Sequence, residues 1–360
     1  MTALFWLIAK LISWNLWTGK RLFPLVPVFE FLNELPFWYH DILFFISLVC
    51  LGVLVIKPTK TIAGILTFSE LFSALGDQNR WQPWEYQYLF ILFLFLLNKN
   101  QPLNFRSAVR LILISIYLFS GISKLNDGFL HSIWSGMLLR QYFGIIQVTS
   151  KTPFLYYAGF SVGFLEIICA TGLLFKRSAG WSAGVLTGIH CFILLVLGPL
   201  GINYNAVIWP WNIAMIGYLY ILFMHRSLDH LRWNDFKAGW NKLVIACWFI
   251  LPSFNLFGWW DNYLSSVLYS GKLNDMVICI KNEASIFAKP FEPYFIHDYK
   301  QLCDGDKMIS VTKWAMKEMK VPVYPERRIF LKIEKSLKQK YNLSDSRYFL
   351  VNRSLTQPLR

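Results

Sequence analysis

Residues 154–200 read FLYYAGFSVGFLEIICATGLLFKRSAGWSAGVLTGIHCFILLVLGPL, and this stretch decides the fold class. Two apolar runs of roughly twenty residues flank a short basic turn at Lys176 and Arg177. A helix of this length crosses a hydrocarbon core of about 30 Å. The stretch therefore predicts two membrane-spanning helices joined by a short loop.

Similar apolar blocks recur along the chain. Hydrophobic residues make up 55% of the 360 residues and charged residues only 16%, which is more apolar surface than a soluble globule buries. Spans are expected near residues 37–56, 61–75, 84–97, 108–122, 154–175, 179–200, 206–224 and 243–260. Residues 1–17 form either a first span or an interfacial helix, without a small-residue cleavage site after them. The pattern predicts an all-α polytopic membrane bundle of eight or nine transmembrane helices.

The end of the apolar pattern near residue 260 divides the chain into three parts. Residues 1–36 hold the N-terminal span or interfacial helix, and residues 37–260 form the transmembrane bundle. Residues 261–360 are expected to form a small α+β domain outside the membrane. Within this tail we expect one strand and two helices, at residues 276–280, 310–320 and 327–341.

The charge pattern predicts on which side the tail lies. The formal net charge is +14, but the basic residues are scattered through loops and tail, so nucleic acid is not expected as a partner. Alternate loops carry eleven Lys and Arg residues on one side and six on the other. Since positively charged short loops stay cytoplasmic, the tail is expected in a periplasm or lumen. The chain is therefore predicted to lie in a lipid bilayer, that of a bacterial inner membrane, with a membrane or periplasmic protein as candidate partner.

Two cysteines, Cys279 and Cys303, lie in the polar tail, whereas the other four fall inside the predicted spans. In an oxidising compartment Cys279 and Cys303 could form a disulfide. Two free thiols are an equal alternative, because the tail contains no CxxC pair.

Three outward loops, at residues 77–84, 120–127 and 203–212, are rich in polar and aromatic side chains. Since they fall on the same side of the membrane, one interpretation is a shared pocket near that surface. The alternative is an ordinary belt of aromatic residues at the headgroup level. The candidate cofactor-binding residues of such a pocket are Trp81, Trp84, Asn205, Trp209 and Trp211.

Ionisable residues inside spans are stronger signals, because a charge in hydrocarbon costs about 2.5 to 3.5 kcal/mol on insertion scales. The candidates are Glu70, Glu166 and His190. Glu166 and His190 stand on adjacent spans at comparable depth from the Lys176 and Arg177 turn, so they could pair. Such a pair is either interhelical glue or part of a proton relay or ligand site.

Lys124 stands at the outer end of a predicted span. There a lysine can extend its ammonium group to the interface. If it instead faced an apolar pocket, desolvation would lower its pKa and make the neutral amine a usable base.

The segment around this lysine, Tyr117 to Asn126 (YLFSGISKLN), resembles a known family. It is similar to the segment of the vitamin K-dependent γ-carboxylases and their bacterial relatives, the horizontally transferred transmembrane (HTTM) family, that carries the catalytic lysine in a Gly-x-x-Lys-Leu context. The resemblance extends to the spans of Glu166 and His190 and to residues 209–212, and covers most of residues 1–265. The helix bundle with Glu-containing spans is also similar to the DoxX-like quinone-linked membrane proteins.

The resemblance implies a function for each of these residues. Lys124 would be the base that deprotonates a hydroquinone cofactor, after which oxygen addition gives a strong base for carboxylation of glutamate. Glu166 and His190 would be catalytic residues that shape or protonate the site. The chain differs from the glutamate carboxylases at Ser123 and Asn126, where those enzymes carry a second lysine and an acidic residue.

Three functions are therefore compared. The first is a γ-carboxylase-like or quinone-linked enzyme, of carbon–carbon lyase type in the former case, with Lys124 as base. The second is a non-catalytic subunit that anchors the exported tail to a partner complex. The third is a secondary transporter, which the absence of inverted repeats and of paired Gly/Pro-broken spans disfavours.

Overall fold

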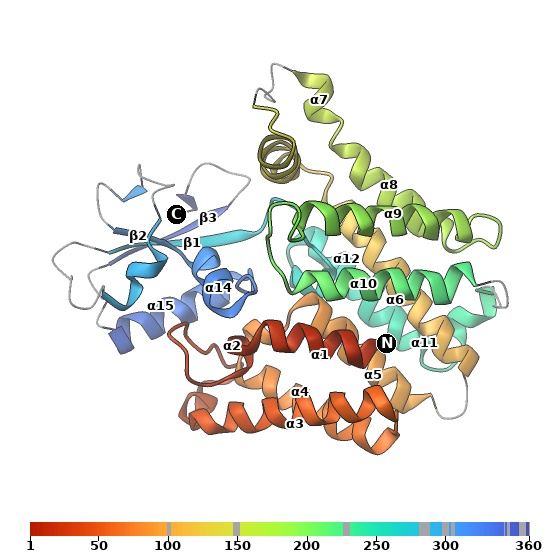
Figure 1. Ribbon diagram of the computed structural model, residues 1–360, viewed down its shortest axis with the longest axis horizontal. Coiled ribbons are helices and arrows are strands. Elements are labelled where there is room, and N and C mark those ends of the chain that lie inside the picture. Colours follow the sequence, from red (N-terminus) through yellow and green to blue (C-terminus); the bar gives the residue numbers. More distant parts are fainter. Residues whose placement is uncertain are drawn as a thin grey trace.

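The computed structural model describes residues 1–98, 102–146, 152–225, 231–280, 289–296, 302–303, 307–341, 343, 346–352 and 358–359. A bundle of helices forms the larger part, and a smaller domain with a sheet lies at one end of it (Figure 1). The bundle helices are α1 (Thr2–Ile12), α2 (Trp14–Trp17), α3 (Phe37–Ile56), α4 (Lys60–Gly76), α5 (Pro83–Leu97), α6 (Pro102–Ser123), α7 (Pro153–Tyr157), α8 (Phe160–Gly172), α9 (Ala179–Leu197), α10 (Ile208–Leu219), α11 (Asn241–Ile245) and α12 (Leu251–Ser253).

Shorter segments connect or extend these helices. Three are wound as π-helix, namely η3 (Phe129–Tyr142), η4 (Tyr220–Met224) and η6 (Ala246–Ile250). Others are 3-10 turns, namely η1 (Glu30–Glu34), η2 (Gln78–Arg80), η5 (Trp233–Lys237), η7 (Phe254–Phe257) and η8 (Tyr263–Ser265). In Figure 1 the η3 segment is seen end-on while the bundle helices lie across the picture, so η3 runs across them.

Four helical stretches of the described residues are long and apolar enough to cross a membrane: Phe37–Ile56, Pro102–Ser123, Pro153–Gly172 and Ala179–Leu197. Four shorter apolar helices accompany them, at Thr2–Ile12, Pro83–Leu97, Ile208–Met224 and Asn241–Phe257. The long stretches are fewer than the eight or nine spans that the sequence predicts, since several apolar runs are shorter than a full span. The outer surface of the bundle carries large apolar side chains such as Trp181 and Phe154, as lipid contact requires.

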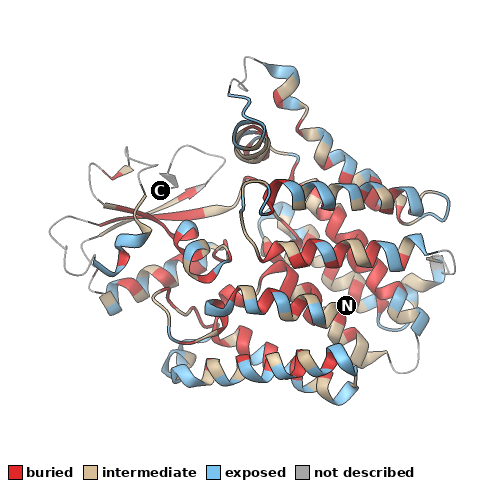
Figure 2. Cartoon of the chain, in the orientation of Figure 1, coloured by how far each residue is buried: buried red, intermediate tan, exposed pale blue. Residues whose placement is uncertain are grey.

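Helix α6 is the centre of the bundle. Of its most apolar window 72% is buried, against 33% for each of the other three long stretches. Figure 2 shows the same contrast, with buried residues concentrated on the inner helices and exposed ones on the outer helices. Most polar residues on α6 therefore face protein and not the surface of the bundle.

Helix α1 belongs to the bundle although the sequence left open whether it spans. It lies between α3 and α10 (Figure 1), and Trp6, Ala9 and Lys10 on it are buried.

The tail forms a four-stranded antiparallel sheet in the order β2-β1-β3-β4 with helices packed on it. Its elements are β1 (Asn274–Ile280), η10 (Lys289–Tyr294), β2 (Lys307–Ser310), α14 (Val311–Met319), α15 (Arg327–Tyr341), β3 (Arg347–Asn352) and β4 (Pro358–Leu359). The predicted strand and both predicted helices are confirmed. Cys279 on β1 forms a disulfide with Cys303, so the disulfide alternative holds.

The tail domain is hydrogen-bonded to the N-terminal third of the chain. The Glu318 carboxylate accepts the backbone N–H groups of Leu22 at 2.6 Å and Phe23 at 3.1 Å. The Tyr324 N–H donates to Asn79 Oδ1 at 3.1 Å, in the loop between α4 and α5. These hydrogen bonds satisfy backbone N–H groups of both parts and join the tail to the bundle.

Candidate functional site

The site begins where helices α6 and α8 cross at two glycines. A Cβ atom added to Gly121 would lie 2.7 Å from the Gly163 carbonyl oxygen, and one added to Gly163 would lie 2.9 Å from the Gly121 oxygen. Small residues let two helix backbones approach this closely in a membrane. The side chains one turn further along both helices are thereby brought together.

Those side chains are Lys124 and Glu166. Lys124 Nζ lies 2.7 Å from Glu166 Oε2, and both side chains are about nine-tenths buried, with exposures of 10% and 7%. The ammonium group also donates to the Ser120 carbonyl oxygen at 3.2 Å and to the Ser120 hydroxyl. Lys124 therefore does not extend to the interface, because its head is held inside the bundle.

A second polar chain lies deeper along α6. Tyr117 Oη and His190 Nε2 are 2.7 Å apart, and His190 Nδ1 and Asn212 Oδ1 are 2.6 Å apart. Since Asn212 Oδ1 can only accept, His190 donates from Nδ1 and accepts the Tyr117 hydroxyl at Nε2. The imidazole is thus held as one neutral tautomer. The pairing of Glu166 with His190, which the sequence allowed, does not form because each side chain has another partner.

Both polar groups face one cavity of about 500 Å³. Tyr117, Ser120 and Lys124 line it from α6, at positions three and four residues apart that share one helix face. Most of the remaining wall is apolar and comes from η3, α8, α9 and α10. The cavity is thus an apolar chamber with a narrow polar stripe on one side.

The rim of the cavity faces the outer surface of the bundle. Phe143, Leu165 and Phe192 line the cavity and are 51%, 41% and 41% exposed. Their exposed faces belong to the apolar outer surface of the bundle. The rim of the cavity therefore lies at this apolar surface, near η3, α8 and α9.

The segment before β1 closes another part of the cavity. Leu268 and Tyr269 line it, and Asn205 Nδ2 donates to the Tyr269 hydroxyl at 3.1 Å. Asn126, two residues after Lys124, donates to the Ser270 carbonyl oxygen at 3.1 Å. This segment is thus tied to the end of α6 that carries Lys124.

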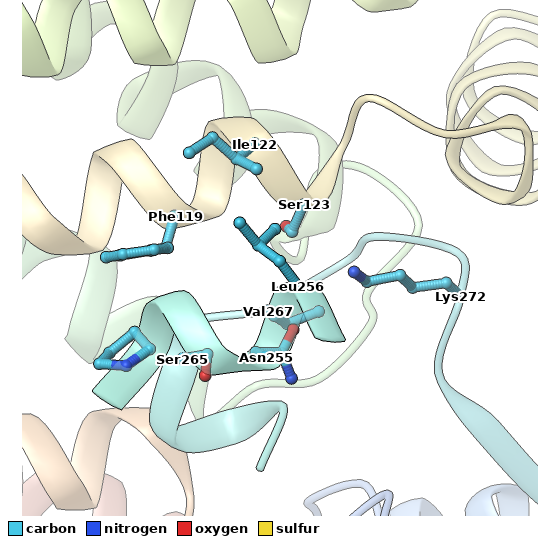
Figure 3. Close-up of a pocket in the computed structure, with 9 residues that line it drawn as sticks. Phe119, Ile122, Ser123, Asn255, Leu256, Ser265, Val267 and Lys272 are labelled. Carbon is cyan, nitrogen blue, oxygen red and sulfur yellow. The ribbon is translucent and has the colours of Figure 1, made fainter. Parts of the chain in front are cut away.

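A much smaller cavity of about 10 Å³ lies on another face of α6 (Figure 3). Ile122 and Ser123 line it from α6, Leu256 from the segment after α12, and Lys272 reaches in from the side. Burial lowers the pKa of Lys272. This space holds one water molecule at most, so no substrate fits beside Lys272.

The structure separates the predicted binding residues. Trp211 lines the large cavity and donates from Nε1 to Gln87 Oε1 at 2.7 Å. Asn205 reaches the cavity only through Tyr269, and Trp209 donates to the Leu197 carbonyl oxygen instead. Trp81 and Trp84 lie away from the cavity, because their loop contacts the tail domain and helix α2. Residues of the loops at 120–127 and 203–212 therefore line the cavity, whereas Trp81 and Trp84 of the loop at 77–84 do not.

Most residues that line the cavity were not predicted as site residues, among them the hydrogen-bonding residues Tyr117, Asn212 and Tyr269. The sequence does carry a signal for the Lys124–Glu166 pair, because GISK at residues 121–124 and GFLE at 163–166 share the same spacing between a glycine and a charged residue. Nothing in the sequence indicates Tyr269, which depends on how the segment before β1 folds back.

The other predicted intramembrane acid, Glu70, lies in a separate buried cluster. Lys10 Nζ is 2.8 Å from Glu70 Oε2 and 4.0 Å from Glu85 Oε1. Lys10 also stands 3.1 Å from the centre of the Trp17 ring. This cluster joins α1, α4 and α5 and contributes no side chain to the cavity.

No protein-family model, curated protein or solved structure matches this chain. Function is therefore argued from the cavity and its polar groups.

Proposed function

We propose that this chain is a membrane enzyme that binds a lipid-soluble hydroquinone beside Lys124 and removes a proton from its hydroxyl group. The observation that carries the proposal is the apolar cavity of about 500 Å³ with a buried Lys124–Glu166 pair on its wall. Its volume is in the range of small-molecule sites, about 300 to 1,000 Å³. A packed interior beside the lysine would have favoured a purely structural pair.

The shape of the cavity supports a ligand that arrives from the membrane. Its rim is formed by exposed apolar side chains, and its walls offer aromatic surface from Phe129, Trp134 and Trp211. A flat aromatic ring fits such walls, and an attached hydrocarbon chain can remain in lipid. A strongly charged, water-soluble substrate would lose its hydration here without enough partners.

The proposed base is the Lys124–Glu166 pair as a unit. With Glu166 2.7 Å away, Lys124 is stable as an ammonium, so the atom able to take a proton is a carboxylate oxygen. Glu166 accepts the hydroxyl proton and becomes a neutral acid, while the Lys124 ammonium remains beside the negative oxygen of the ligand. One O–H bond is broken and one is formed, and the net charge of the site is unchanged.

Tyr117, His190 and Asn212 provide a second polar contact for the same ligand. Tyr117 and Lys124 are seven residues apart on α6, which is about 10 Å along the helix axis. A six-membered ring with oxygens on opposite sides, hydrogen-bonded at each end, spans a distance of this order. The ligand would therefore lie along α6, with its second oxygen near the His190 chain.

The resemblance of residues 117–126 to the lysine segment of the γ-carboxylases supports the same ligand class. Carboxylation of peptidyl glutamate is not part of the proposal, because Ser123 and Asn126 depart from the pattern of those enzymes. Quinone-linked chemistry, shared with the DoxX-like proteins, requires only the cavity and its polar stripe.

We also propose the topology that the sequence predicts, with eight or nine spans and the tail in a periplasm or lumen. The four long apolar stretches, the four shorter ones and α4 together supply enough helices. The Cys279–Cys303 disulfide supports an oxidising compartment for the tail.

The test compares oxidation of a short-chain naphthohydroquinone by the wild type, Lys124→Met and Lys272→Met, all in lipid nanodiscs under air. Lys272 is the matched control, because it is a lysine beside the same helix whose cavity admits no substrate. Lys124→Met removes the ammonium from the Lys124–Glu166 unit that acts as base, and it leaves no positive charge beside the negative oxygen of the ligand. Loss of a general base costs about 10²- to 10⁴-fold in rate, so we expect a loss of this order for Lys124→Met and little change for Lys272→Met. Equal rates for Lys124→Met and wild type would reject the proposal and favour the anchoring subunit.

A further inference from the structure

We infer that Tyr269 is a specificity-determining residue of the cavity, whose phenol donates a hydrogen bond to an acceptor oxygen of the ligand. The inference rests on the proposed function and adds a recognition contact from outside the helix bundle. It also connects the cavity to the segment that leads into the tail domain.

The first observation is unused hydrogen-bonding capacity. Tyr269 lines the cavity, and its hydroxyl accepts from Asn205 Nδ2 at 3.1 Å. A phenol has one hydrogen and two lone pairs, so this contact leaves its hydrogen available. The Asn205 Oδ1 atom is also buried without a hydrogen-bond partner among the described residues. A part-buried polar pair with spare hydrogen-bonding capacity beside a cavity can accept a ligand contact.

The second observation is backbone strain at the same place. Tyr269 and Asn205 both have left-handed backbones, with φ of 48° and 52°. This conformation is uncommon for residues other than glycine, and such strain concentrates at functional sites. In these two conformations the side chains of Tyr269 and Asn205, which belong to different loops, form a hydrogen bond.

The third observation is how firmly Tyr269 is held. Next in sequence, Ser270 accepts from Asn126, and Gly271 packs so closely that an added Cβ would lie 2.1 Å from the Gly128 carbonyl oxygen. Gly271 also has a φ of +70°, which favours glycine. The ring is thus fixed relative to the end of α6 that carries Lys124.

The Tyr269 phenol is suited to donate a hydrogen bond to a ligand oxygen. Burial, and next the nearby Tyr204, hold the pKa of Tyr269 well above its ordinary value, so the hydroxyl stays neutral at physiological pH. A neutral phenol donates to a carbonyl or hydroxyl oxygen and does not compete with the Lys124–Glu166 pair for a proton. The class of ligand is therefore an apolar ring bearing an oxygen acceptor.

The experiment measures binding by tryptophan fluorescence quenching in nanodiscs with two probes. One is a 1,4-naphthoquinone with a short isoprenoid chain, and the other is the naphthalene with the same chain and no ring oxygens. The proteins are wild type, Tyr269→Phe, and Asn205→Gly, which keeps the left-handed backbone but removes the amide. Tyr220→Phe serves as control, because Tyr220 is 57% exposed and outside the cavity lining.

For Tyr269→Phe we expect the Kd of the quinone to rise about 5- to 10-fold, the usual effect of one lost hydrogen bond. The Kd of the naphthalene and the thermal unfolding midpoint should not change. Asn205→Gly should weaken quinone binding less, and Tyr220→Phe not at all.

Three outcomes would overturn the inference. Unchanged quinone binding by Tyr269→Phe would show that the Tyr269 hydroxyl does not contact the ligand, while leaving the proposed function intact. Equal weakening of both probes would show that the ring acts by shape and not by its hydroxyl. Absence of quinone binding by the wild type would reject the proposed function and this inference together.

Discussion

Lys124 Nζ and Glu166 Oε2 lie 2.7 Å apart, and each residue stands three positions after the glycine at which their two helices touch. The geometry of the pair is therefore set by the backbones of α6 and α8. Because the two glycines leave no room between the helices, the ammonium and the carboxylate meet at the cavity wall.

The helix crossing gives the first prediction. In Gly121→Ala the new methyl group would meet the Gly163 carbonyl oxygen at 2.7 Å, so the helices must separate. We expect a lower thermal unfolding midpoint and at least tenfold slower hydroquinone oxidation, since misplacement by about 1 Å can cost a hundredfold. Gly184→Ala on α9 is the matched control, because an added Cβ there meets nothing within 4 Å. If Gly121→Ala and Gly184→Ala had the same unfolding midpoint and the same oxidation rate, the glycine crossing would not be what positions Lys124 and Glu166.

The second prediction concerns the energetics of the pair. Lys124→Met leaves the Glu166 carboxylate buried without its ammonium, which costs about 3 to 5 kcal/mol in comparable buried pairs. The double variant Lys124→Met with Glu166→Leu removes both charges and should recover most of that stability, but no activity. Thermal unfolding and hydroquinone oxidation of the single and double variants measure the two effects separately. If the double variant were less stable than Lys124→Met, the pair would be held by something other than its charges.

The third prediction compares the two acids beside Lys10. Glu70 accepts from Lys10 at 2.8 Å and also from the Ser47 hydroxyl, whereas Glu85 Oε1 has no hydrogen-bond partner among the described residues. Glu70→Gln removes the direct counter-charge of a fully buried ammonium, so we expect a large fall in unfolding midpoint. Glu85→Gln keeps an acceptor for Trp6 and should cost much less. The reverse order would assign the counter-charge of Lys10 to Glu85.

The fourth prediction is a pH dependence in the tail domain. Burial raises the pKa of Glu326, so the folded domain favours its protonated form. Such a group adds stability below its unfolded pKa, and this contribution is lost as the pH rises through the folded pKa. Glu326→Gln mimics the neutral acid and keeps an acceptor for Asn262. It should therefore be more stable than wild type at pH 7, by about 1 kcal/mol or less, and equal to it near pH 4.

Protease resistance of the tail against temperature, at both pH values, measures this difference. Glu334→Gln is the control, because Glu334 forms an exposed pair with Lys338 that contributes little to stability. If Glu326→Gln gained as much stability at pH 4 as at pH 7, the gain would not come from removing the charge of the buried Glu326 carboxylate.

The sequence predicted the positions of several helices, but four described helices and not eight or nine are long enough to cross a membrane, and the contacts between helices were not predicted. Span positions follow from apolar runs, so the limits of α5 and α9 fall within a few residues of those predicted. The η3 segment was missed, because His131, Ser132, Ser135 and Arg140 interrupt its apolar character. It nevertheless forms a wall of the cavity.

The candidate site shows the same limit. Glu166 and His190 were identified because ionisable residues are costly inside apolar runs, and Lys124 was identified from the resemblance of residues 117–126 to the lysine segment of a known family. Their partners were not, since pairing depends on the rotation of each helix about its axis, which hydropathy does not encode. Trp81 and Trp84 were assigned to the site because their loop was expected on the same side of the membrane as the other two. Loops on one side of a membrane need not be near each other, and this loop contacts the tail domain and helix α2.

The contact of the tail with residues 22, 23 and 79 has a consequence for how the chain is made. A ribosome produces these acceptor and donor groups long before it reaches Glu318 and Tyr324. Until those two residues have been made and the tail domain has folded, the backbone N–H groups of Leu22 and Phe23 and the side chain of Asn79 lack these hydrogen-bond partners. Premature termination would therefore harm the region translated first.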